Sequence, residues 1–338
     1  MKILVSGATG FLGKNLVQHL LMRKYSVLGL GRNEQQGALL KSWGAKFQKS
    51  DLSQSEILKD SCHNVDAVIH CAALSAPWGS YSDHYNINVL GTKNLLKAAM
   101  EQQVARFIHI SSPSIYFKYC DQYNIRENSD LKHPKVNHYA TSKYLAELEV
   151  EKYRKLGLQT IILRPRAIFG PGDEAIIPRV IKAQRLGFFP IFRRKDILMD
   201  ITYVDNVSLG IIHSLNASDQ SCQQVYNITN DEPIIITDFL QKFFAKIQMS
   251  FKPRYIPYSI GRSSARLIES LYRFLPHREP PITSYTVGLF TYSQTLNIEN
   301  AKKNLAYSPN VSLAEAIDRY GNWYLKQSAK GRQAWRPH

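Results

Sequence analysis

Hydrophobic positions along the chain alternate between short, uninterrupted apolar runs and longer stretches with helical spacing. The strand-like runs cover residues 2–6, 26–31, 45–49, 66–70, 106–111 and 160–164. Helical patterns fall between most of them, most clearly over residues 86–102 and 139–155. Continuous apolar runs are typical of strands that are buried on both faces of a parallel sheet. The repeated strand–helix units therefore predict an α/β fold with a parallel sheet that helices cover on both faces.

The alternation breaks after residue 172, which predicts a second domain. The predicted division is a first domain (1–172, with 200–230 returning to it), a smaller C-terminal α/β domain (173–199 and 231–328) and a basic tail (329–338). Within the returning segment, the runs 200–207 and 225–229 are expected to rejoin the main sheet. The polar end of the chain, from Lys326 onward, is expected to be frayed.

Composition narrows the class of protein without giving an activity. Of the 338 residues, 44% are hydrophobic and 21% charged, which is ordinary for a globular protein. No apolar run approaches the roughly 20 residues of a membrane span, and the first strand runs directly into a glycine turn, which leaves no room for a signal peptide. Cysteines 62, 71, 120 and 222 form no CxxC pair, so neither a metal site nor a disulfide framework is predicted. We therefore expect a cytoplasmic protein.

The formal net charge of +16 suggests that this protein meets an anionic partner. There is no block of five or more Lys and Arg residues and no nucleic-acid module, so a nucleic-acid partner is not expected. Phosphate-bearing ligands, an anionic membrane surface and a simply solvated basic surface remain as explanations.

A glycine-rich turn links the first strand to the first helical pattern. Its sequence is Gly7-Ala-Thr-Gly10-Phe-Leu-Gly13, and the strand–turn–helix context is that of a dinucleotide-binding motif, although the spacing is GxxGxxG. Glycines permit a tight turn and close approach of the backbone to a pyrophosphate, which the helix N-terminus faces. The predicted cofactor contacts in this loop are Gly7, Thr9, Gly10, Phe11, Leu12 and Gly13.

The end of the second strand bears on the choice of cofactor. An acidic residue about 20 residues past the glycines would hold the adenosine 2′-hydroxyl, but this chain has Gly31 followed by Arg32. A guanidinium in place of a carboxylate suits a 2′-phosphate, so NADP(H) is favoured and NAD(H) is the alternative. Asp51 and Leu52, after the third strand, are placed beside the adenine. The small residues Ala72 and Ala73 end the fourth strand and let a cofactor lie against the backbone.

Tyr139 and Lys143 form the candidate catalytic pair. Four residues apart on a helix, they share one face, and the ammonium is expected to lower the pKa of the phenol toward working pH. Such a pair can exchange a proton with a carbonyl or alcohol oxygen. Hydroxyls such as that of Ser112 follow the fifth strand, at the carboxyl edge of the sheet where open α/β sheets bind ligands.

Seven motifs occur in the order of a known family: Gly7-x-x-Gly10-x-x-Gly13, Asp51-Leu52, Ala72-Ala73, Asn88-Val-x-Gly-Thr92, Ser111-Ser112, Tyr139-x-x-x-Lys143 and Arg164-Pro165. With this set the chain resembles, over nearly its whole length, the extended short-chain dehydrogenases/reductases of the NAD-dependent epimerase/dehydratase superfamily. The runs 73–79 and 164–173 look most like the 3β-hydroxysteroid dehydrogenase-like branch, in particular the bacterial 2-alkyl-3-oxoalkanoate reductases.

The resemblance implies that the first domain is a dinucleotide-binding Rossmann domain with a doubly wound parallel sheet and that the smaller C-terminal α/β domain binds the substrate. It also implies a role for each matching residue. Tyr139 would be the general acid/base, Lys143 would bind the nicotinamide ribose, and Ser112 would hydrogen-bond the substrate oxygen. Asn88 would support the active-site helix, and Pro165 and Ile168 would meet the nicotinamide amide. A homodimer through helices 86–102 and 139–155 is expected by the same analogy.

These features predict an NAD(P)-dependent carbonyl reductase or alcohol dehydrogenase acting on a lipophilic hydroxy or keto substrate, such as a long-chain β-keto acid or a steroid-like ketone. A sugar-nucleotide epimerase or dehydratase is the alternative, and a non-catalytic nucleotide-binding scaffold is the alternative from another class. The predicted substrate contacts are Ser75, Trp78, Tyr85, Ser112 and Ser114, although Trp78 is equally well explained as a packing residue.

The stretch from Ser259 to Leu275 has a marked amphipathic pattern. One helical stripe is apolar (Ile260, Leu267, Ile268, Leu271 and Leu275), the opposite side carries Arg262, Arg266, Glu269 and Arg273, and His277 and Arg278 follow. The simplest interpretation is a surface helix that packs its apolar stripe on the core. Peripheral membrane contact through 259–278, or a lid over a lipophilic pocket, is the alternative.

Overall fold

The computed structural model describes residues 1–185, 187–275 and 278–334. Its centre is a seven-stranded sheet in the order β12-β7-β5-β4-β1-β2-β3, in which every pair of neighbours is parallel. The strands are β1 (Lys2–Ser6), β2 (Ser26–Gly31), β3 (Lys46–Lys49), β4 (Ala67–His70), β5 (Arg106–Ile110), β7 (Thr160–Pro165) and β12 (Gln224–Ile228). The strand order reverses beside β1, so the predicted doubly wound Rossmann sheet is confirmed.

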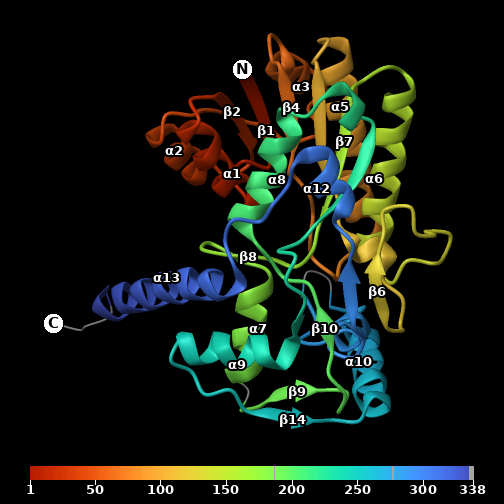
Figure 1. Ribbon diagram of the computed structural model, residues 1–338, viewed down its shortest axis with the longest axis vertical. Helices are drawn as coiled ribbons and strands as arrows, with labels where there is room; N and C mark the ends of the chain where they lie inside the picture. Colours follow the sequence, from red (N-terminus) through yellow and green to blue (C-terminus); the bar gives the residue numbers. More distant parts are fainter. Residues whose placement is uncertain (186, 276–277, 335–338) are drawn as a thin grey trace.

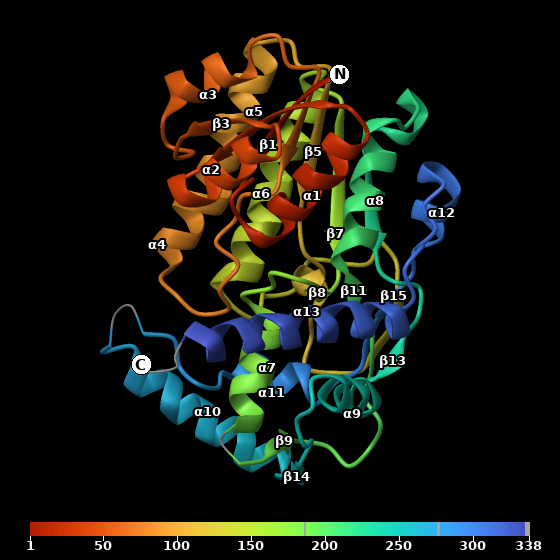
Figure 2. The ribbon, with the colours of Figure 1, turned by 90° about the vertical axis from the view of Figure 1, so that its left-hand side faces the viewer.

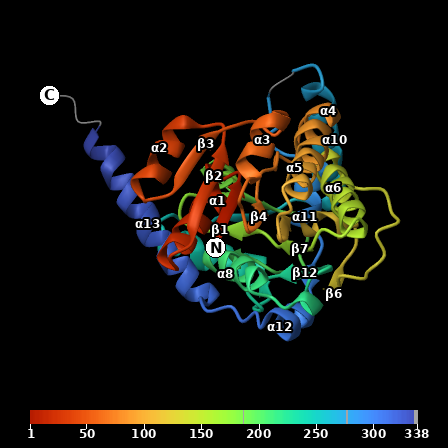
Figure 3. The same ribbon diagram turned by 90° about the horizontal axis from the view of Figure 1, so that it is seen from above.

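Helices cover both faces of this sheet because successive side chains of each strand point to opposite sides. Ile3 and Val5 of β1 pack with α1 (Phe11–Met22), α2 (Glu34–Ser42) and α8 (Val204–Leu215), whereas Leu4 packs with the helices on the other face. That second layer contains α3 (Ser55–Cys62), α5 (Gly91–Glu101) and α6 (His138–Lys155), and it stands apart from the first layer in Figure 3. The predicted helix over 86–102 begins earlier, as α4 (Tyr81–His84) and a π-helical turn (Tyr85–Leu90) that lead into α5.

A second core lies at the C-terminal side of the sheet, below it in Figures 1 and 2. Phe169, Phe243 and Tyr320 are among its fully buried side chains. Its helices are α7 (Ile176–Arg185), α9 (Ile236–Lys246) and α13 (Leu313–Ala334). Its four-stranded sheet has the order β13 (Ile234–Ile235), β10 (Leu198–Met199), β15 (Gln294–Leu296) and β6 (Gln122–Ile125), and β14 (Pro253–Tyr255) pairs with β9 (Phe189–Ile191). Strand β6 shows that a segment from the N-terminal half contributes to this region.

Two sequence-based expectations differ from the structure. The run 225–229 joins the main sheet as β12, but 200–207 does not: β11 (Thr202–Tyr203) pairs with β8 (Ile168–Phe169) in a separate two-stranded sheet, and α8 starts at Val204. The buried side chains of Val204, Val207 and Ile211 have helical spacing, and a strand would place Val204 on the face opposite the other two. The end of the chain is not frayed from Lys326, since α13 continues to Ala334; residues 335–338 lie outside the described residues.

Helix α10 (Tyr258–Tyr272) carries its amphipathic pattern the opposite way round from the simplest interpretation. Ile260, Leu267 and Leu271 are 57%, 64% and 58% exposed, so the apolar stripe faces solvent. The side toward the protein holds the buried Gly261 and Ala265 and also Glu269, which accepts hydrogen bonds from the amide and the hydroxyl of Ser284, both at 2.8 Å, whereas Arg266 and Arg273 are exposed. Packing of the stripe on the core was therefore the wrong expectation. Residues 276 and 277, including the predicted His277, lie outside the described residues.

The remaining described helices are short. They are α11 (Ser284–Leu289), which packs beside α10, α12 (Glu299–Leu305), and 3-10 turns at Pro113–Tyr116 and Asp219–Ser221. Within the described ranges, no helix combines the length and the apolar character needed to cross a bilayer.

Candidate active site

The loop between β1 and α1 is built for close approach of a ligand to the backbone. Gly7 has φ +69°, and a Cβ there would lie 2.6 Å from the amide nitrogen of Ala72. A Cβ on Gly13 would lie 2.2 Å from the carbonyl oxygen of Gly7. Helix α1 starts at Phe11, so its free first-turn amides open toward this loop. A cradle of backbone donors with no side chains in the way fits a dinucleotide pyrophosphate.

The adenosine end of the predicted site explains why no acidic residue follows β2. A Cβ on Gly31 would lie 2.4 Å from Oγ1 of Thr9, so a longer side chain cannot be placed there without moving Thr9. The Arg32 side chain is 73% exposed, and its guanidinium lies 4.0 Å from the Asp51 carboxylate. Both residues line a hollow of about 440 Å³ together with Lys49, Ser50, Ser53 and Gln54. Lys49 is a second cation that the sequence reasoning missed.

Leu52 and the two alanines take different positions around this end of the sheet. Leu52 packs beside α5, where a Cβ on Gly91 would lie 2.8 Å from its Cδ1. Leu52 therefore contributes to the packing of α5, in addition to its predicted place beside the adenine. Ala72 lies directly against Gly7, and Ala73 next to it is exposed, which keeps this edge of β4 free of large side chains.

Helix α6 brings the predicted catalytic groups to the carboxyl end of β5. Asn137 caps the helix, its side-chain oxygen accepting from the amide of Ala140 at 2.8 Å. This cap places Tyr139 in the first turn, where its phenol hydrogen-bonds Ser112. One turn later, Lys143 is buried and its Nζ donates to the carbonyl oxygen of Ile110 at 2.5 Å. Ser112, Tyr139 and Lys143 therefore lie together at one edge of the sheet.

Asn88 holds two parts of this site together. It lies in the π-helical turn, a feature often found at functional sites. Its Nδ2 donates to Oγ of Ser142 on α6 at 2.8 Å, and its Oδ1 accepts from the amide of Leu74 at 2.7 Å. Asn88 was predicted to support the active-site helix, and it contacts α6 directly through this hydrogen bond to Ser142.

The protonation of the pair differs from the sequence-based expectation. Burial raises the pKa of Tyr139 above its usual value, and the hydrogen bond with Ser112 opposes this. Burial lowers the pKa of Lys143 to about 8, against the opposing effects of Glu147 and Cys71. Burial and Ser112, rather than Lys143, set the direction of the pKa shift of the phenol. At neutral pH the phenol keeps its proton.

The predicted substrate residues lie on a loop next to the start of α6. Ser75 is exposed and Trp78 is partly exposed. Ring nitrogens fix this loop: His84 Nε2 lies 3.0 Å from the Ala76 carbonyl oxygen, and His138 Nδ1 lies 3.0 Å from that of Gly79.

Two other predicted substrate residues are placed differently. Tyr85 stacks on Tyr81 with ring centroids 5.7 Å apart, so part of its ring is used in packing. Ser114 is buried beside Ser112, and its hydroxyl has no hydrogen-bond partner among the described residues.

Several residues beside the catalytic pair were missed by sequence reasoning. Tyr285 of α11 packs edge-to-face on Phe117, with centroids 5.3 Å apart, and Phe117 follows the turn that Ser112 begins. Burial raises the pKa of Tyr285 to about 12; Arg166 opposes this shift and Tyr139 adds to it. Arg166 lies within the run 164–173, which the sequence had singled out. Nothing in the local sequence of Tyr285 indicates that α11 folds back over the site.

Pro165 and Ile168 lie where the main sheet passes into the second region. Pro165 ends β7 and Ile168 begins β8. Between them Ala167 has φ 43°, a left-handed conformation that is costly for a residue other than glycine. The chain therefore turns sharply at the point where the resemblance places the nicotinamide.

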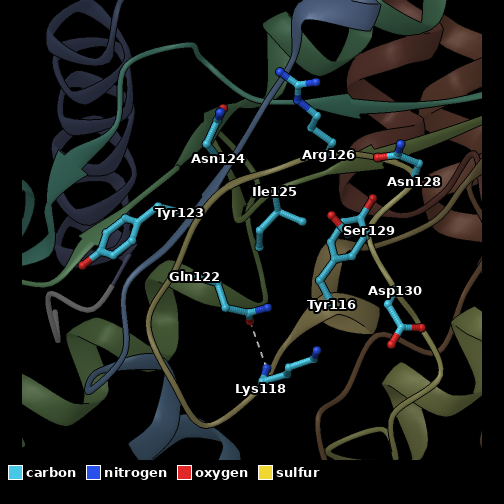
Figure 4. A pocket seen from close by; sticks show the side chains of 10 residues that line it. All are labelled: Tyr116, Lys118, Gln122, Tyr123, Asn124, Ile125, Arg126, Asn128, Ser129 and Asp130. Atoms are coloured by element: carbon cyan, nitrogen blue, oxygen red, sulfur yellow. Dashed lines mark hydrogen bonds between the residues drawn. The ribbon is translucent and has the colours of Figure 1, made fainter.

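A second hollow, of about 410 Å³, is formed by the segment from Tyr116 to Asp130 and is shown in Figure 4. Its lining is largely polar, and within it the amide of Lys118 donates to Oε1 of Gln122 at 3.0 Å. None of the residues predicted from the sequence to form the site lines this hollow. The candidate active site remains the edge of the sheet beside β1, β5 and β7.

The fold and the glycine loop are those of a dinucleotide-binding enzyme, and Ser112, Tyr139 and Lys143 are its candidate catalytic group. The family model described as "NAD dependent epimerase/dehydratase family" matches residues 3–229. The chain belongs to this family, the extended short-chain dehydrogenases/reductases, and is an NAD-dependent enzyme of that type.

Three relatives match nearly the whole chain. It is 35% identical to the uncharacterised protein YbjS of Escherichia coli (strain K12), over 96% of this chain and 97% of YbjS. It is 29% identical to the 2-alkyl-3-oxoalkanoate reductase of Shewanella oneidensis, over 93% and 84%. It is 30% identical to the decarboxylating sterol-4-alpha-carboxylate 3-dehydrogenase of Mus musculus, over 93% and 86%.

A solved structure agrees in fold. The UDP-glucose 4-epimerase of Thermotoga maritima superposes with a TM-score of 0.76 at 21% identity, over 97% of this chain and 100% of that chain. At this identity the likeness concerns the fold alone.

Proposed function

We propose that the protein is an NADP(H)-dependent reductase of a lipophilic ketone, with a long-chain 3-oxo acid as the best candidate substrate. The observation that carries this proposal is the group of Ser112, Tyr139 and Lys143 at the carboxyl end of β5, next to which Phe117 and Tyr285 pack on each other. Aromatic side chains beside the reacting groups suit an alkyl chain better than a sugar. Two of the matched relatives have printed names that describe 3-oxoalkanoate and sterol substrates.

The residues of the site divide the chemistry among themselves. The bound dinucleotide would supply the hydride for the carbonyl carbon. Ser112 and Tyr139 hydrogen-bond the carbonyl oxygen as negative charge develops there, and the phenol donates its proton to that oxygen. A raised pKa keeps Tyr139 protonated at neutral pH, which suits the direction of reduction. Lys143 orients the ribose by analogy with the family.

Oxidation of NADPH and NADH by the purified protein tests this function. The panel contains a long-chain 3-oxo acid, a 3-ketosteroid and a UDP-sugar. We expect net NADPH oxidation with a lipophilic ketone and none with the UDP-sugar. Conversion of the UDP-sugar without net change in the cofactor would replace this proposal with the epimerase alternative.

The preference for NADP(H) is proposed from Arg32 and Lys49, which line the hollow at the end of β2 where Gly31 leaves no place for a carboxylate. In an Arg32→Ala variant we expect KM for NADPH to rise about tenfold, the value of one charge-assisted hydrogen bond, while KM for NADH stays within about twofold. Steady-state kinetics with both cofactors measures this. The control is Arg23→Ala, an exposed arginine at the end of α1. Equal changes for both cofactors would remove Arg32 from this role.

We also propose that the exposed stripe of α10 contacts an anionic phospholipid surface. Figure 2 places α10 along the outer edge of the second region, beside α11, which carries Tyr285. The exposed apolar side chains of Ile260, Leu267, Leu271, Phe274 and Leu275 are the hydrophobic part of this surface. Between residues 252 and 275 there are five basic side chains, Lys252, Arg254, Arg262, Arg266 and Arg273, and one acidic, Glu269. A helix with an outward apolar stripe and basic flanks suits the boundary of a bilayer.

The membrane contact is tested by sedimentation with vesicles. Leu267→Ser combined with Leu271→Ser should weaken binding to phosphatidylglycerol-containing vesicles at least about tenfold, because each leucine buries apolar surface worth ~1.5–3 kcal/mol. The control pair is Met22→Ser with Leu39→Ser, two exposed apolar residues of the Rossmann domain. Unchanged vesicle binding combined with a loss of self-association would assign the stripe to a contact between subunits.

We propose a homodimer through α5 and α6, which pack side by side, and in which Leu148 of α6 is an exposed apolar side chain. A mass of one chain by light scattering at micromolar concentration would contradict this.

A further inference from the structure

Two arginines at the end of β7 have opposite surroundings. Arg164 and Arg166 are both buried, at 3% and 6% exposure. Arg164 is fully paired: its Nε lies 2.8 Å from Oε1 of Glu147 and its Nη2 lies 2.5 Å from Oε2. Arg166 forms no ion pair within 4.0 Å with any described residue, and its Nε has no hydrogen-bond partner there. A buried guanidinium without an anion is costly unless a ligand completes it.

Arg166 is fixed at the edge of the sheet that holds the catalytic group. Strands β5 and β7 are parallel neighbours with Ile110 opposite Leu163, so Ser112 and Arg166 both lie just beyond the carboxyl ends of adjacent strands. The backbone of Arg166 is held on two sides: its amide donates to the Ile228 carbonyl at 3.1 Å, and its carbonyl accepts from the Thr202 hydroxyl.

The groups that face Arg166 lie on elements of the second region. Arg166 and Tyr139 both act on the pKa of Tyr285 of α11, the guanidinium lowering it and the phenol raising it. Asp200 is the acidic residue whose charge acts on Arg166, but no ion pair within 4.0 Å joins the two among the described residues. The Asp200 carboxylate instead accepts from the amide of Leu296 at 2.7 Å. Burial raises the pKa of Asp200 to about 6, so it is still largely ionised at neutral pH, and it leaves the Nε of Arg166 without a partner.

We propose that Arg166 binds the carboxylate of a 3-oxo or 3-hydroxy acid substrate and so selects acids over neutral ketones of the same length. This inference rests on the proposed reductase function. In such a substrate one carbon atom separates the carboxylate from the reacting carbon, so a carboxylate held by Arg166 positions the carbonyl for Ser112 and Tyr139. A planar guanidinium is suited to bind a carboxylate through two parallel hydrogen bonds. Two matched relatives have printed names that contain a carboxylate, 3-oxoalkanoate and sterol-4-alpha-carboxylate.

The test compares a long-chain 3-hydroxy acid with its methyl ester, using NADP+ and measuring oxidation, because the hydroxy acid does not decarboxylate. We expect the wild type to prefer the acid. In Arg166→Met, kcat/KM for the acid should fall about 10- to 100-fold, the loss of charge-assisted hydrogen bonds, and kcat/KM for the ester should stay within about twofold. Arg166→Lys should keep part of the preference for the acid. Arg179→Met, an exposed arginine of α7, is the control.

Other outcomes point to other roles for Arg166. If the acid and the ester lose activity equally and the urea midpoint falls, Arg166 is a structural partner of Asp200 and the proposal is wrong. If instead a UDP-sugar is converted and Arg166→Met abolishes that conversion, the bound anion is a diphosphate.

A failure of the proposed function gives a different result from a failure of this inference. If the wild type oxidises neither compound, the proposed function fails. Isothermal titration calorimetry then still tests Arg166, because it measures binding of the 3-hydroxy acid and needs no turnover. Tenfold weaker binding to Arg166→Met than to the wild type supports the carboxylate site, and equal affinity rejects it.

Discussion

Replacing Tyr139 by Phe should lower kcat/KM for ketone reduction by about 10²–10⁴-fold, the usual contribution of a positioned general acid. The variant keeps the ring and its packing in the first turn of α6 and removes only the hydroxyl that hydrogen-bonds Ser112. Since the phenol donates its proton in the transition state, the loss should appear in kcat. The dissociation constant of NADPH, measured by fluorescence titration, should change less than about twofold.

A matched control for this variant lies five residues along the same helix. The ammonium of Lys135 lies 4.5 Å from the ring centroid of Tyr144, and this ring packs against the cluster that contains Ile115 and Tyr116. Tyr144→Phe should keep wild-type turnover. Retained turnover in Tyr139→Phe, or an equal loss in both variants, would exclude Tyr139 as the proton donor.

The pH dependence of ketone reduction and of alcohol oxidation gives a second test of Tyr139 as the proton donor. Burial raises the pKa of Tyr139, so the phenol is protonated through neutral pH and reduction should vary little with pH there. Oxidation requires the phenolate, whose fraction grows tenfold for each pH unit below that pKa. The wild type should therefore show a rate of oxidation that rises from pH 6 to 8. In Tyr139→Phe this rise should be absent.

Local patterns in the sequence predicted the main sheet because each of its elements is short and contiguous. The apolar runs, the glycine turn and the Tyr139–Lys143 spacing each report on a single strand, loop or helix face. Their shared location at one edge of the sheet then follows from the parallel topology. The family resemblance and the enzyme class are confirmed by the comparisons.

Long-range contacts decided the features that the sequence did not predict. Tyr285 reaches the site because α11 packs back against Phe117, which no local pattern encodes. The orientation of α10 depends on whether Glu269 finds a partner inside, and Ser284 supplies one. The pKa of Tyr139 depends on burial, which the spacing to Lys143 alone could not reveal. For α10 and Tyr139 the amphipathic or chemical pattern was present in the sequence, but the environment of these residues came from another element.

The largest expected effect on stability comes from the ion pair between Glu147 and Arg164. It joins α6, one turn beyond Lys143, to β7, and both side chains are almost fully buried. Arg164 also donates to the hydroxyl of Tyr116, which in turn donates to Oδ1 of Asn227 on β12 at 3.1 Å. Glu147→Ala would leave a buried guanidinium without its carboxylate, a change that typically costs 3–5 kcal/mol, so the free energy of unfolding should fall by about that amount.

Urea denaturation measures how much the ion pair itself contributes to the free energy of unfolding. The four proteins compared are the wild type, Glu147→Ala, Arg164→Met, and Glu147→Leu combined with Arg164→Met. The double variant should regain most of the stability lost in Glu147→Ala, because replacing both charges removes the unpaired one. Glu315→Ala is the control, since Glu315 forms an exposed pair with Arg319 and its loss should cost no more than about 1 kcal/mol. A similarly small loss in Glu147→Ala would show that water or Tyr116 compensates Arg164. The fixed position of α6 against β7, and with it the position of Tyr139, would then have to depend on apolar packing alone.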